Sequence, residues 1–266
     1  MTPATGPIFI GGLSYSGKTP LRIILSAHPD LSLTRKTYLW DRYYGRFGDL
    51  RDRRGLERCL RALGADPSLA SLHPDVDAVR REFSGGPPTY ACLFAVLHRQ
   101  AAARLGKRRW GEQLGFVERY ADPIFADFPE ARMIHMIRDP RERMASIFDT
   151  QRPRPGQRGW ETAKWRSSAE LAARNQLHHP DGYRVVSYDA LVDDTAATVR
   201  ALCAFVGEAY VPAVADAVGA FSRGGVAARA AVGHSGAALD RRGAADRVGM
   251  TAWRALERRR TARVGG

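Results

Sequence analysis

The chain has 266 residues, of which 44% are hydrophobic and 26% charged, so it can bury a substantial core as a single domain over 1–266 and is not a wholly disordered chain. Its 41 Lys and Arg residues exceed its 28 Asp and Glu residues and give a formal charge of +13. Because the arginines are scattered in doublets and triplets, this excess does not by itself distinguish an anionic partner from a compositional bias toward arginine.

Apolar segments alternate with helical patterns along the chain. Strands are predicted at 7–10, 31–34, 131–138 and 183–188. Helices are predicted at 20–27, 55–63, 75–83, 89–105, 140–149, 161–177, 195–205 and 251–260. The Pro-, Gly- and Arg-rich segment 151–159 is expected to be a loop, and the Gly- and Ala-rich segment 222–249 a loop or mobile flap. This alternation predicts an α/β fold with a parallel β-sheet flanked by helices.

The sequence also bears on compartment and metal binding. No apolar run approaches the ~18 residues that a membrane-spanning helix needs. Residues 1–7 lack the basic start and long apolar core of a secretory signal. Cys59, Cys92 and Cys203 are too widely separated to indicate a disulfide framework or a metal-binding knuckle. We therefore expect a cytoplasmic protein with no transmembrane segment and no metal.

Residues 12–19 (GLSYSGKT) fit the phosphate-loop pattern G-x-x-x-x-G-K-[ST] and stand between a predicted strand and a predicted helix. Glycines let the backbone curl so that consecutive amides point inward. The helix N-terminus adds partial positive charge, and Lys18 adds a full one. We expect a phosphate group to lie over residues 14–19.

A second cation, Arg138, stands at the end of the strand predicted at 131–138. Its guanidinium is placed to bind a second phosphate by a bidentate contact. In a P-loop kinase that uses ATP–Mg, Asp139 would instead be the acid that follows an apolar strand. Capping of the next helix already accounts for Asp139, because Pro140 follows it. The kinase stays an alternative.

The blocks around these two sites resemble the P-loop-related sulfotransferases of bacterial type, which use 3′-phosphoadenosine-5′-phosphosulfate (PAPS). The family's 5′-phosphosulfate loop, [RK]-S-G-T-T, is similar to residues 15–19 (YSGKT), and a His-Pro pair follows at 28–29. Its 3′-phosphate site, R-D-P-R-x-x-x-x-S, matches residues 138–146. Its Y-E-D-L and F-L-G segments resemble 188–191 (YDAL) and 205–207 (FVG). The blocks keep the family order between residues 7 and 207.

This resemblance implies a P-loop nucleoside-triphosphatase-like sulfotransferase fold. It also implies transfer of a sulfuryl group from PAPS to a hydroxyl or amine, with 3′-phosphoadenosine-5′-phosphate (PAP) as the product. The acceptor class it suggests is a carbohydrate, glycolipid or secondary metabolite, with no nucleic acid as partner. The residues that it assigns to cofactor binding are Ser14, Tyr15, Ser16, Gly17, Lys18, Thr19, Pro20, Arg138, Ser146 and Tyr188.

Three departures from the family pattern affect the catalytic residues more than the cofactor residues. Tyr15 replaces the usual basic residue before Ser-Gly, while Lys18 occupies a usual threonine position. Lys36 stands where relatives similar to tyrosylprotein sulfotransferases carry a glutamate base. The block G-D-K-x-P appears as residues 111–115 (GEQLG), with Gln113 in place of lysine. A catalytically inactive PAPS-binding relative is therefore a further alternative.

Four residues are candidates for the chemistry. Lys18 suits stabilisation of the charge that grows on the leaving oxygen. Glu112 is the first candidate for a general base near the acceptor hydroxyl, and Asp41 is the second. Lys36 is a candidate for binding an anionic acceptor or assisting the leaving group. A solvated or salt-bridged surface group is the alternative for Glu112, Asp41 and Lys36.

Other polar and aromatic residues are expected to be structural. His135 lies in the middle of a strand, where a hydrogen-bonded histidine of the sheet is favoured over a catalytic one. One set is expected to pack on a helical face: Trp160, Trp165 and Leu171. A second set forms an aromatic cluster: Tyr38, Trp40, Tyr43 and Tyr44. Half of this cluster is expected to pack in the core, and the other half either lines an acceptor pocket or packs as well. Arginines and aromatics also occur in nucleic-acid-binding proteins, but no reading motif accompanies them here.

Overall fold

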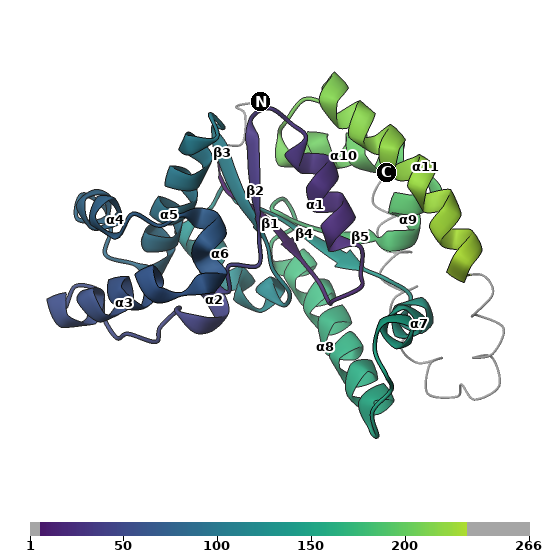
Figure 1. Ribbon diagram of the computed structural model, residues 1–266, viewed down its shortest axis with the longest axis horizontal. Coiled ribbons are helices and arrows are strands. Elements are labelled where there is room, and N and C mark those ends of the chain that lie inside the picture. Colours follow the sequence, from purple (N-terminus) through teal and green to yellow (C-terminus); the bar gives the residue numbers. More distant parts are fainter. Residues whose placement is uncertain (1–5, 233–266) are drawn as a thin grey trace.

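A five-stranded parallel sheet forms the centre of the molecule (Figure 1). The computed structural model describes residues 6–232, with side chains described as far as residue 222. The strand order is β2-β3-β1-β4-β5. The strands are β1 (Ile8–Gly11), β2 (Leu31–Arg35), β3 (Arg109–Gln113), β4 (Arg132–Ile137) and β5 (Tyr183–Ser187). All pairings are parallel, as the alternation of strands and helices predicts.

The central strand β1 is buried on both faces. Ile8 and Ile10 face one hydrophobic cluster and Phe9 faces the other, and all three side chains are fully buried. This explains why the strand reads as a continuous apolar run. β1 pairs with β3 along one edge and with β4 along the other. The chain runs from β1 to β2 on one side of the sheet, and from β3 it crosses to β4 on the other side. Where connections diverge in this way, open α/β sheets have a crevice at the carboxyl ends of the strands and bind ligands there, so we expect a crevice at the carboxyl end of β1.

Helices cover both faces of the sheet (Figure 1). One face packs against α1 (Lys18–Ser26), α9 (Tyr188–Asp193), α10 (Thr195–Val206) and α11 (Pro212–Val232). The other face packs against α5 (Tyr90–Arg104), α6 (Ala121–Asp127), α8 (Gln157–His178) and the 3₁₀ helix η2 (Val117–Tyr120). The elements that pack around α5 are α2 (Leu39–Arg42), α3 (Arg53–Ala65), η1 (Pro67–Leu72) and α4 (Val76–Phe83). Helix α7 (Pro140–Thr150) follows the carboxyl end of β4.

The two helices that begin next to the crevice start in different ways. Asp139 caps α7, because its carboxylate accepts hydrogen bonds from the backbone N–H of Arg141 at 2.7 Å and of Glu142 at 3.4 Å. Helix α1 has Gly17 at the capping position, no side-chain cap and no acidic residue in its first turn. The first N–H groups of a helix have no partner within it. The start of α1 therefore presents free donors and partial positive charge toward the crevice.

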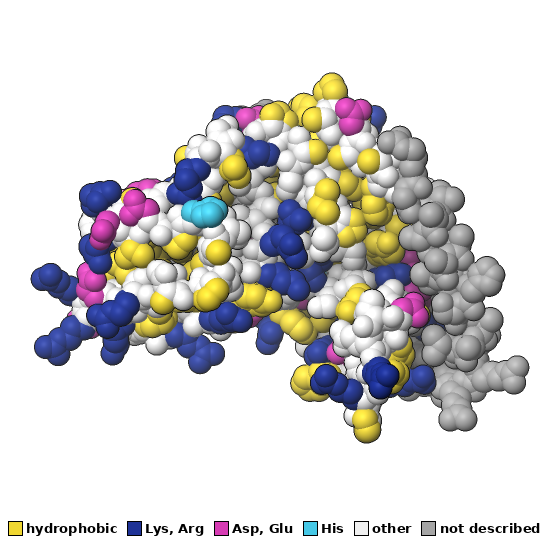
Figure 2. Space-filling model, in the orientation of Figure 1, with side chains coloured by type: hydrophobic (Ala, Val, Ile, Leu, Met, Phe, Trp, Pro, Cys, Tyr) yellow, Lys and Arg dark blue, Asp and Glu magenta, His cyan; other side chains and the backbone are white. Residues whose placement is uncertain are grey.

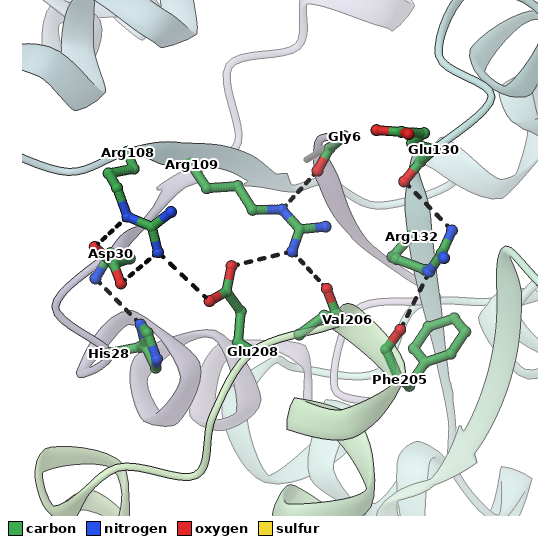
Figure 3. Close-up of polar contacts among 10 residues, drawn as sticks. All are labelled: Gly6, His28, Asp30, Arg108, Arg109, Glu130, Arg132, Phe205, Val206 and Glu208. Atoms are coloured by element: carbon green, nitrogen blue, oxygen red, sulfur yellow. Dashed lines mark hydrogen bonds and ion pairs between the residues drawn. The ribbon is translucent and has the colours of Figure 1, made fainter. Parts of the chain in front are cut away.

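Many of the arginines that give the chain its positive charge are structural. At the amino ends of the strands, Arg108 forms a bidentate pair with Asp30, at 2.7 and 2.6 Å. The neighbouring Arg109 donates to Gly6 O at 2.6 Å and forms an ion pair with Glu208 at 3.2 Å (Figure 3). These contacts tie the segment after α10 to the edge of the sheet opposite the crevice. They account for part of the cationic excess without a ligand.

The structure differs from the predicted elements in several places. None of α2, α6, α9, η1 and η2 was predicted from the sequence, nor were residues 212–221 of α11. The strand β3 escaped prediction, because Arg, Gly, Glu and Gln fill it where an apolar run is expected. Helix α8 begins at Gln157, within the predicted loop 151–159. The loop expected at 222–249 is wrong for residues 222–232, which belong to α11, where alanines favour the helix. Segment 233–249 and the helix predicted at 251–260 lie outside the described residues. The packing role expected of Trp160 is also wrong, because its side chain is 64% exposed.

No helix within residues 6–232 combines the length and the apolarity that a bilayer span requires.

Two adjacent isoleucines of α1 test the packing of this helix on the sheet. Ile24 is 1% exposed and Ile23 is 54% exposed. We expect Ile24→Ala to lower the free energy of unfolding by about 2–5 kcal/mol, because it opens a cavity in the core. The matched control Ile23→Ala should change it by less than about 1 kcal/mol. Urea unfolding measures both values, and equal losses would contradict the orientation of α1.

Candidate functional site

A cavity of about 720 Å³ lies at the carboxyl end of β1, where the topology predicts a ligand site. Five cationic side chains line it: Lys18, Lys36, Arg138, Arg143 and Lys164. Among the described residues, Glu161 is the acidic residue of its wall. Figure 2 shows Lys and Arg side chains along the middle of this face and on the lower protrusion formed by α7 and α8. This charge balance favours an anionic ligand.

The phosphate loop between β1 and α1 depends on two glycines. Gly12 has a φ of +111°, and a Cβ there would lie 2.1 Å from the carbonyl oxygen of Met136. Gly17 has a φ of +90°, and its Cβ would lie 2.2 Å from the ring of Tyr188. Both positions combine a left-handed backbone with a close approach that only glycine permits. The pattern G-x-x-x-x-G in the sequence is thus explained by packing against β4 and α9.

Lys18 is folded back into the loop that precedes it. Its side chain is 5% exposed, and its Nζ donates to Gly12 O at 2.5 Å and to Leu13 O. Burial lowers the pKa of Lys18 to about 7, although the nearby Glu118 carboxylate acts in the opposite direction. The ammonium therefore gains or loses its charge near neutral pH while it borders the cavity.

Arg138 joins the two blocks, 12–19 and 138–146, in which the sequence predicts phosphate binding and which lie far apart along the chain. It donates to the carbonyl oxygen of Tyr15 at 3.3 Å and to Ser146 Oγ at 3.0 Å. Its guanidinium also lies 4.5 Å from the ring centre of Tyr188, the residue that packs on Gly17. One side chain therefore contacts the phosphate loop, helix α7 and helix α9. This arrangement gives the cavity two cationic groups on adjoining elements, Lys18 and Arg138.

A buried network of hydrogen-bonded side chains contacts the phosphate loop (residues 12–19) on its protein-facing side. The Glu118 carboxylate accepts from the N–H of Gly12 at 3.0 Å and from Ser168 Oγ at 3.3 Å. The imidazole of His135 contacts Tyr183 Oη at 2.6 Å and Ser168 Oγ at 2.9 Å. Burial lowers the pKa of His135, which is fully buried. The prediction of a hydrogen-bonded sheet histidine is confirmed, whereas no pattern in the sequence pointed to Glu118.

The structure brings most of the predicted cofactor residues to one cavity. Those that line it are Ser14, Tyr15, Gly17, Lys18, Thr19, Pro20, Arg138 and Tyr188. Ser16 and Ser146 do not line it. Ser16 Oγ donates to Leu13 O at 2.7 Å and so stabilises the loop. Ser146 reaches the cavity only through its bond with Arg138.

The four predicted catalytic residues divide into two pairs. Lys18 and Lys36 line the cavity, and Lys36 is exposed. Glu112 and Asp41 are not part of its wall. The carboxylate of Glu112 is fully buried and accepts from the N–H of Thr37 at 2.9 Å and from its hydroxyl.

Asp41 belongs to α2 and lies among aromatic side chains. Burial raises the pKa of Asp41, and its carboxylate accepts a hydrogen bond from Tyr120 Oη at 3.3 Å. The surrounding aromatic cluster packs as expected for Trp40 and Tyr43, which are buried, while Tyr38 and Tyr44 are half-buried. All four aromatic residues lie outside the cavity wall.

Three charged residues of the wall were not singled out by the sequence. Arg143 donates through Nε to Ser14 O at 3.0 Å and through a terminal nitrogen to Glu161. Lys164 Nζ donates to the other oxygen of Glu161 at 3.0 Å. The place of Arg143 inside the block 138–146 was a usable signal. Glu161 and Lys164 lie on a separate helix, α8, and their spacing in the sequence does not indicate that they line the cavity.

Gln113, which stands where the family pattern has lysine, also contacts the phosphate loop. Its Nε2 donates to Thr19 Oγ1 at 3.3 Å, and its Oε1 accepts from Arg22 Nε at 3.2 Å. The amide therefore fixes the hydroxyl of Thr19 at the cavity wall without adding charge.

Comparison with known proteins assigns the family. The model described as "Sulfotransferase family" matches residues 7–212, which is more than half of the chain. The chain belongs to the sulfotransferase family. Among curated proteins no match is found.

Solved structures of sulfotransferases share the fold. The sulfotransferase domain from the Synechococcus PCC 7002 olefin synthase aligns with a TM-score of 0.53 and 23% identity, over 78% of this chain and 75% of that chain. The sulfotransferase domain from the curacin biosynthetic pathway gives 0.50 and 17%, over 79% and 76%. Sulfotransferase STF1 from Mycobacterium tuberculosis H37Rv gives 0.50 and 17%, over 80% and 70%. The five-stranded parallel sheet with flanking helices is thus a sulfotransferase fold.

The lowered pKa of Lys18 predicts how stability depends on pH. The folded chain releases a proton from Lys18 near pH 7, whereas the unfolded chain holds it up to the ordinary value of 10.5. The unfolded state binds more protons between these values, so this group makes the free energy of unfolding rise with pH, by up to about 1.4 kcal/mol per pH unit.

Chemical denaturation from about pH 7 to about pH 9.5 measures this effect. The free energy of unfolding of the wild type should rise relative to that of Lys18→Met across the window. Parallel curves would contradict a buried Lys18 with a lowered pKa.

Proposed function

We propose that this protein transfers the sulfuryl group of PAPS to a hydroxyl or amine of a small-molecule or glycan acceptor. The observation that carries the proposal is the contact between Arg138 and the carbonyl of Tyr15, because it joins the two blocks of the family pattern at one cavity. A nucleotide with anionic groups on both its 3′ and 5′ positions needs two such cationic sites close together. A high net positive charge alone would not place two cationic sites next to each other.

The residues of the cavity fit such a nucleotide. The volume of 720 Å³ lies within the range of small-molecule sites, about 300–1,000 Å³. The uncapped start of α1 offers backbone N–H donors for the 5′ end. The Arg138–Ser146 pair offers a guanidinium and a hydroxyl for a 3′-phosphate. Among the residues of the wall that the structure describes, five cations against one acid leave the site electropositive.

Each part of the site has a role in the proposed reaction. PAPS, when bound, supplies the activated sulfuryl group. The N–H groups at the start of α1 and the ammonium of Lys18 are placed to stabilise negative charge that grows on the leaving oxygen. Arg138 and Ser146 bind and orient, away from the reacting atoms. Thr19, held by Gln113, adds a hydroxyl at the same end of the site.

One observation weighs against the alternative of a P-loop kinase. The carboxylate of Asp139, the acid that would follow the apolar strand, is used as the cap of α7. The secondary-metabolite, carbohydrate or glycolipid nature of the acceptor is proposed from the family resemblance.

Substitutions of the Arg138–Ser146 pair test the assignment of the 3′-phosphate. Hydrogen bonds to charged groups contribute about 1.5–3 kcal/mol, so Arg138→Ala should weaken PAP binding by roughly 10- to 150-fold. Ser146→Ala should weaken it less. The affinity for AMP, which lacks the 3′-phosphate, should change little in either variant. Isothermal titration calorimetry measures all these affinities.

Arg141→Ala is the matched control, because Arg141 lies exposed on the same helix in the same block. Its affinity for PAP should equal that of the wild type within about twofold. Equal losses for PAP and AMP in Arg138→Ala would sink the assignment of this site to the 3′-phosphate.

A further inference from the structure

The wall of the cavity holds one carboxylate within the described part of the chain, that of Glu161. Its side chain is only 11% exposed, although it borders open space. The two carboxylates that the sequence favoured as bases lie elsewhere, since Glu112 is bonded to Thr37 and Asp41 to Tyr120. A residue that accepts a proton from an acceptor must reach the cavity, and among these three carboxylates Glu161 does.

Two cations hold the carboxylate of Glu161 in a fixed place. Arg143 donates to one oxygen, and Lys164 donates to the other at 3.0 Å. Arg143 is itself 3% exposed and donates to Ser14 O at 3.0 Å. One guanidinium therefore connects Glu161 to the phosphate loop. This connection fixes the carboxylate relative to the site proposed for the sulfuryl donor.

We propose that Glu161 is the residue that accepts the proton of the acceptor hydroxyl. This inference rests on the sulfuryl transfer proposed above and assigns its general base. A carboxylate offers about four lone-pair positions, and the two hydrogen bonds to Arg143 and Lys164 leave capacity for a third donor. The position is unrelated to the family's glutamate, which Lys36 replaces here.

The charge state of Glu161 suits this role. Burial raises the pKa of Glu161, but hydrogen bonds from Arg143 and Lys164 outweigh it and hold the pKa below its ordinary value. The carboxylate is thus ionised at neutral pH. A carboxylate with a low pKa is too weak a base to deprotonate a free alcohol. As the acceptor oxygen bonds to sulfur, however, the hydroxyl loses electron density and becomes more acidic. The proton therefore moves to Glu161 during or after the formation of that bond.

The atoms and charges of the step balance. A bond forms between the acceptor oxygen and sulfur, and the bond between sulfur and the bridging phosphate oxygen breaks. The electron pair of that bond stays with the phosphate of PAP. The hydroxyl proton moves to an oxygen of Glu161 and passes from there to water.

Glu161→Gln tests the proposal, with Glu170→Gln as the matched control on the exposed face of α8. The first measurement is PAP binding by calorimetry. Glu170→Gln should bind PAP as the wild type does within about threefold, and binding of PAP by Glu161→Gln shows that its nucleotide site is folded. The second is PAP release from PAPS with two probe acceptors: 4-nitrophenol, which ionises near neutral pH, and benzyl alcohol, which does not. If benzyl alcohol is not accepted, PAP release with water as the acceptor replaces it. If 4-nitrophenol is not accepted either, the loss of Glu161→Gln with water is compared with that of Glu161→Asp.

The expected result depends on the acceptor. A general base contributes about 10²–10⁴-fold to the rate, so Glu161→Gln should lose this factor in kcat with benzyl alcohol or water. With 4-nitrophenol, at pH values where this probe is ionised and has no proton to give up, the loss in kcat should be about tenfold or less. Glu161→Asp, which keeps a carboxylate, should recover part of the loss. Glu170→Gln should match the wild type. A merely structural residue would not produce a loss that depends on acceptor ionisation.

Contrary results are distinguishable. Equal losses with both probes, or wild-type rates with the un-ionised acceptor, would overturn the role of Glu161 and leave the proposed function intact. If Glu161→Gln does not fold, the same comparison is made with Glu161→Ala, which also lacks the carboxylate, and wild-type turnover of the un-ionised acceptor by that variant would also overturn it. A wild type that neither binds PAP nor releases it from PAPS would overturn both proposals.

Discussion

The tight turn between β1 and α1 is the constraint on which the rest of the site depends. Gly12 lies against the backbone of β4 and donates its N–H to the buried Glu118, while Gly17 lies against the ring of Tyr188. These contacts fix where α1 begins and leave its first N–H groups without a side-chain cap. Lys18, Arg138 and Arg143 all contact carbonyl oxygens of this one turn. Displacing the turn would therefore move every cation that those contacts hold at the cavity wall.

Positive charge has two different uses in this chain. Arg108 and Arg109, at the amino ends of the strands, are paired with Asp30 and Glu208 and stabilise the fold. At the carboxyl ends, five cations line one cavity with a single described acid among them. The formal charge of +13 mixes these populations, which explains why it could not identify a ligand. Position, rather than number, indicates which cations bind an anion.

Local patterns predicted the parts of the structure that depend on local chemistry. The turn at residues 12–19, the capping of α7 by Asp139 and the apolar strands β1 and β4 were all readable from the sequence. The strand β3 was not, because burial of Glu112 and Gln113 depends on tertiary hydrogen bonds rather than on an apolar run. Glu161 was missed because its place in the cavity wall arises from α7 and α8 meeting beside the phosphate loop, which no spacing in the sequence reveals.

We propose that the cavity recognises a nucleotide phosphorylated at both the 3′ and the 5′ positions. Calorimetric titration of the wild type with PAP and with ATP, each with and without Mg²⁺, measures this preference. PAP should bind more tightly than ATP, and Mg²⁺ should not increase the affinity for PAP. Tighter binding of ATP that requires Mg²⁺, with PAP bound no better than AMP, would rule out this recognition and favour a kinase.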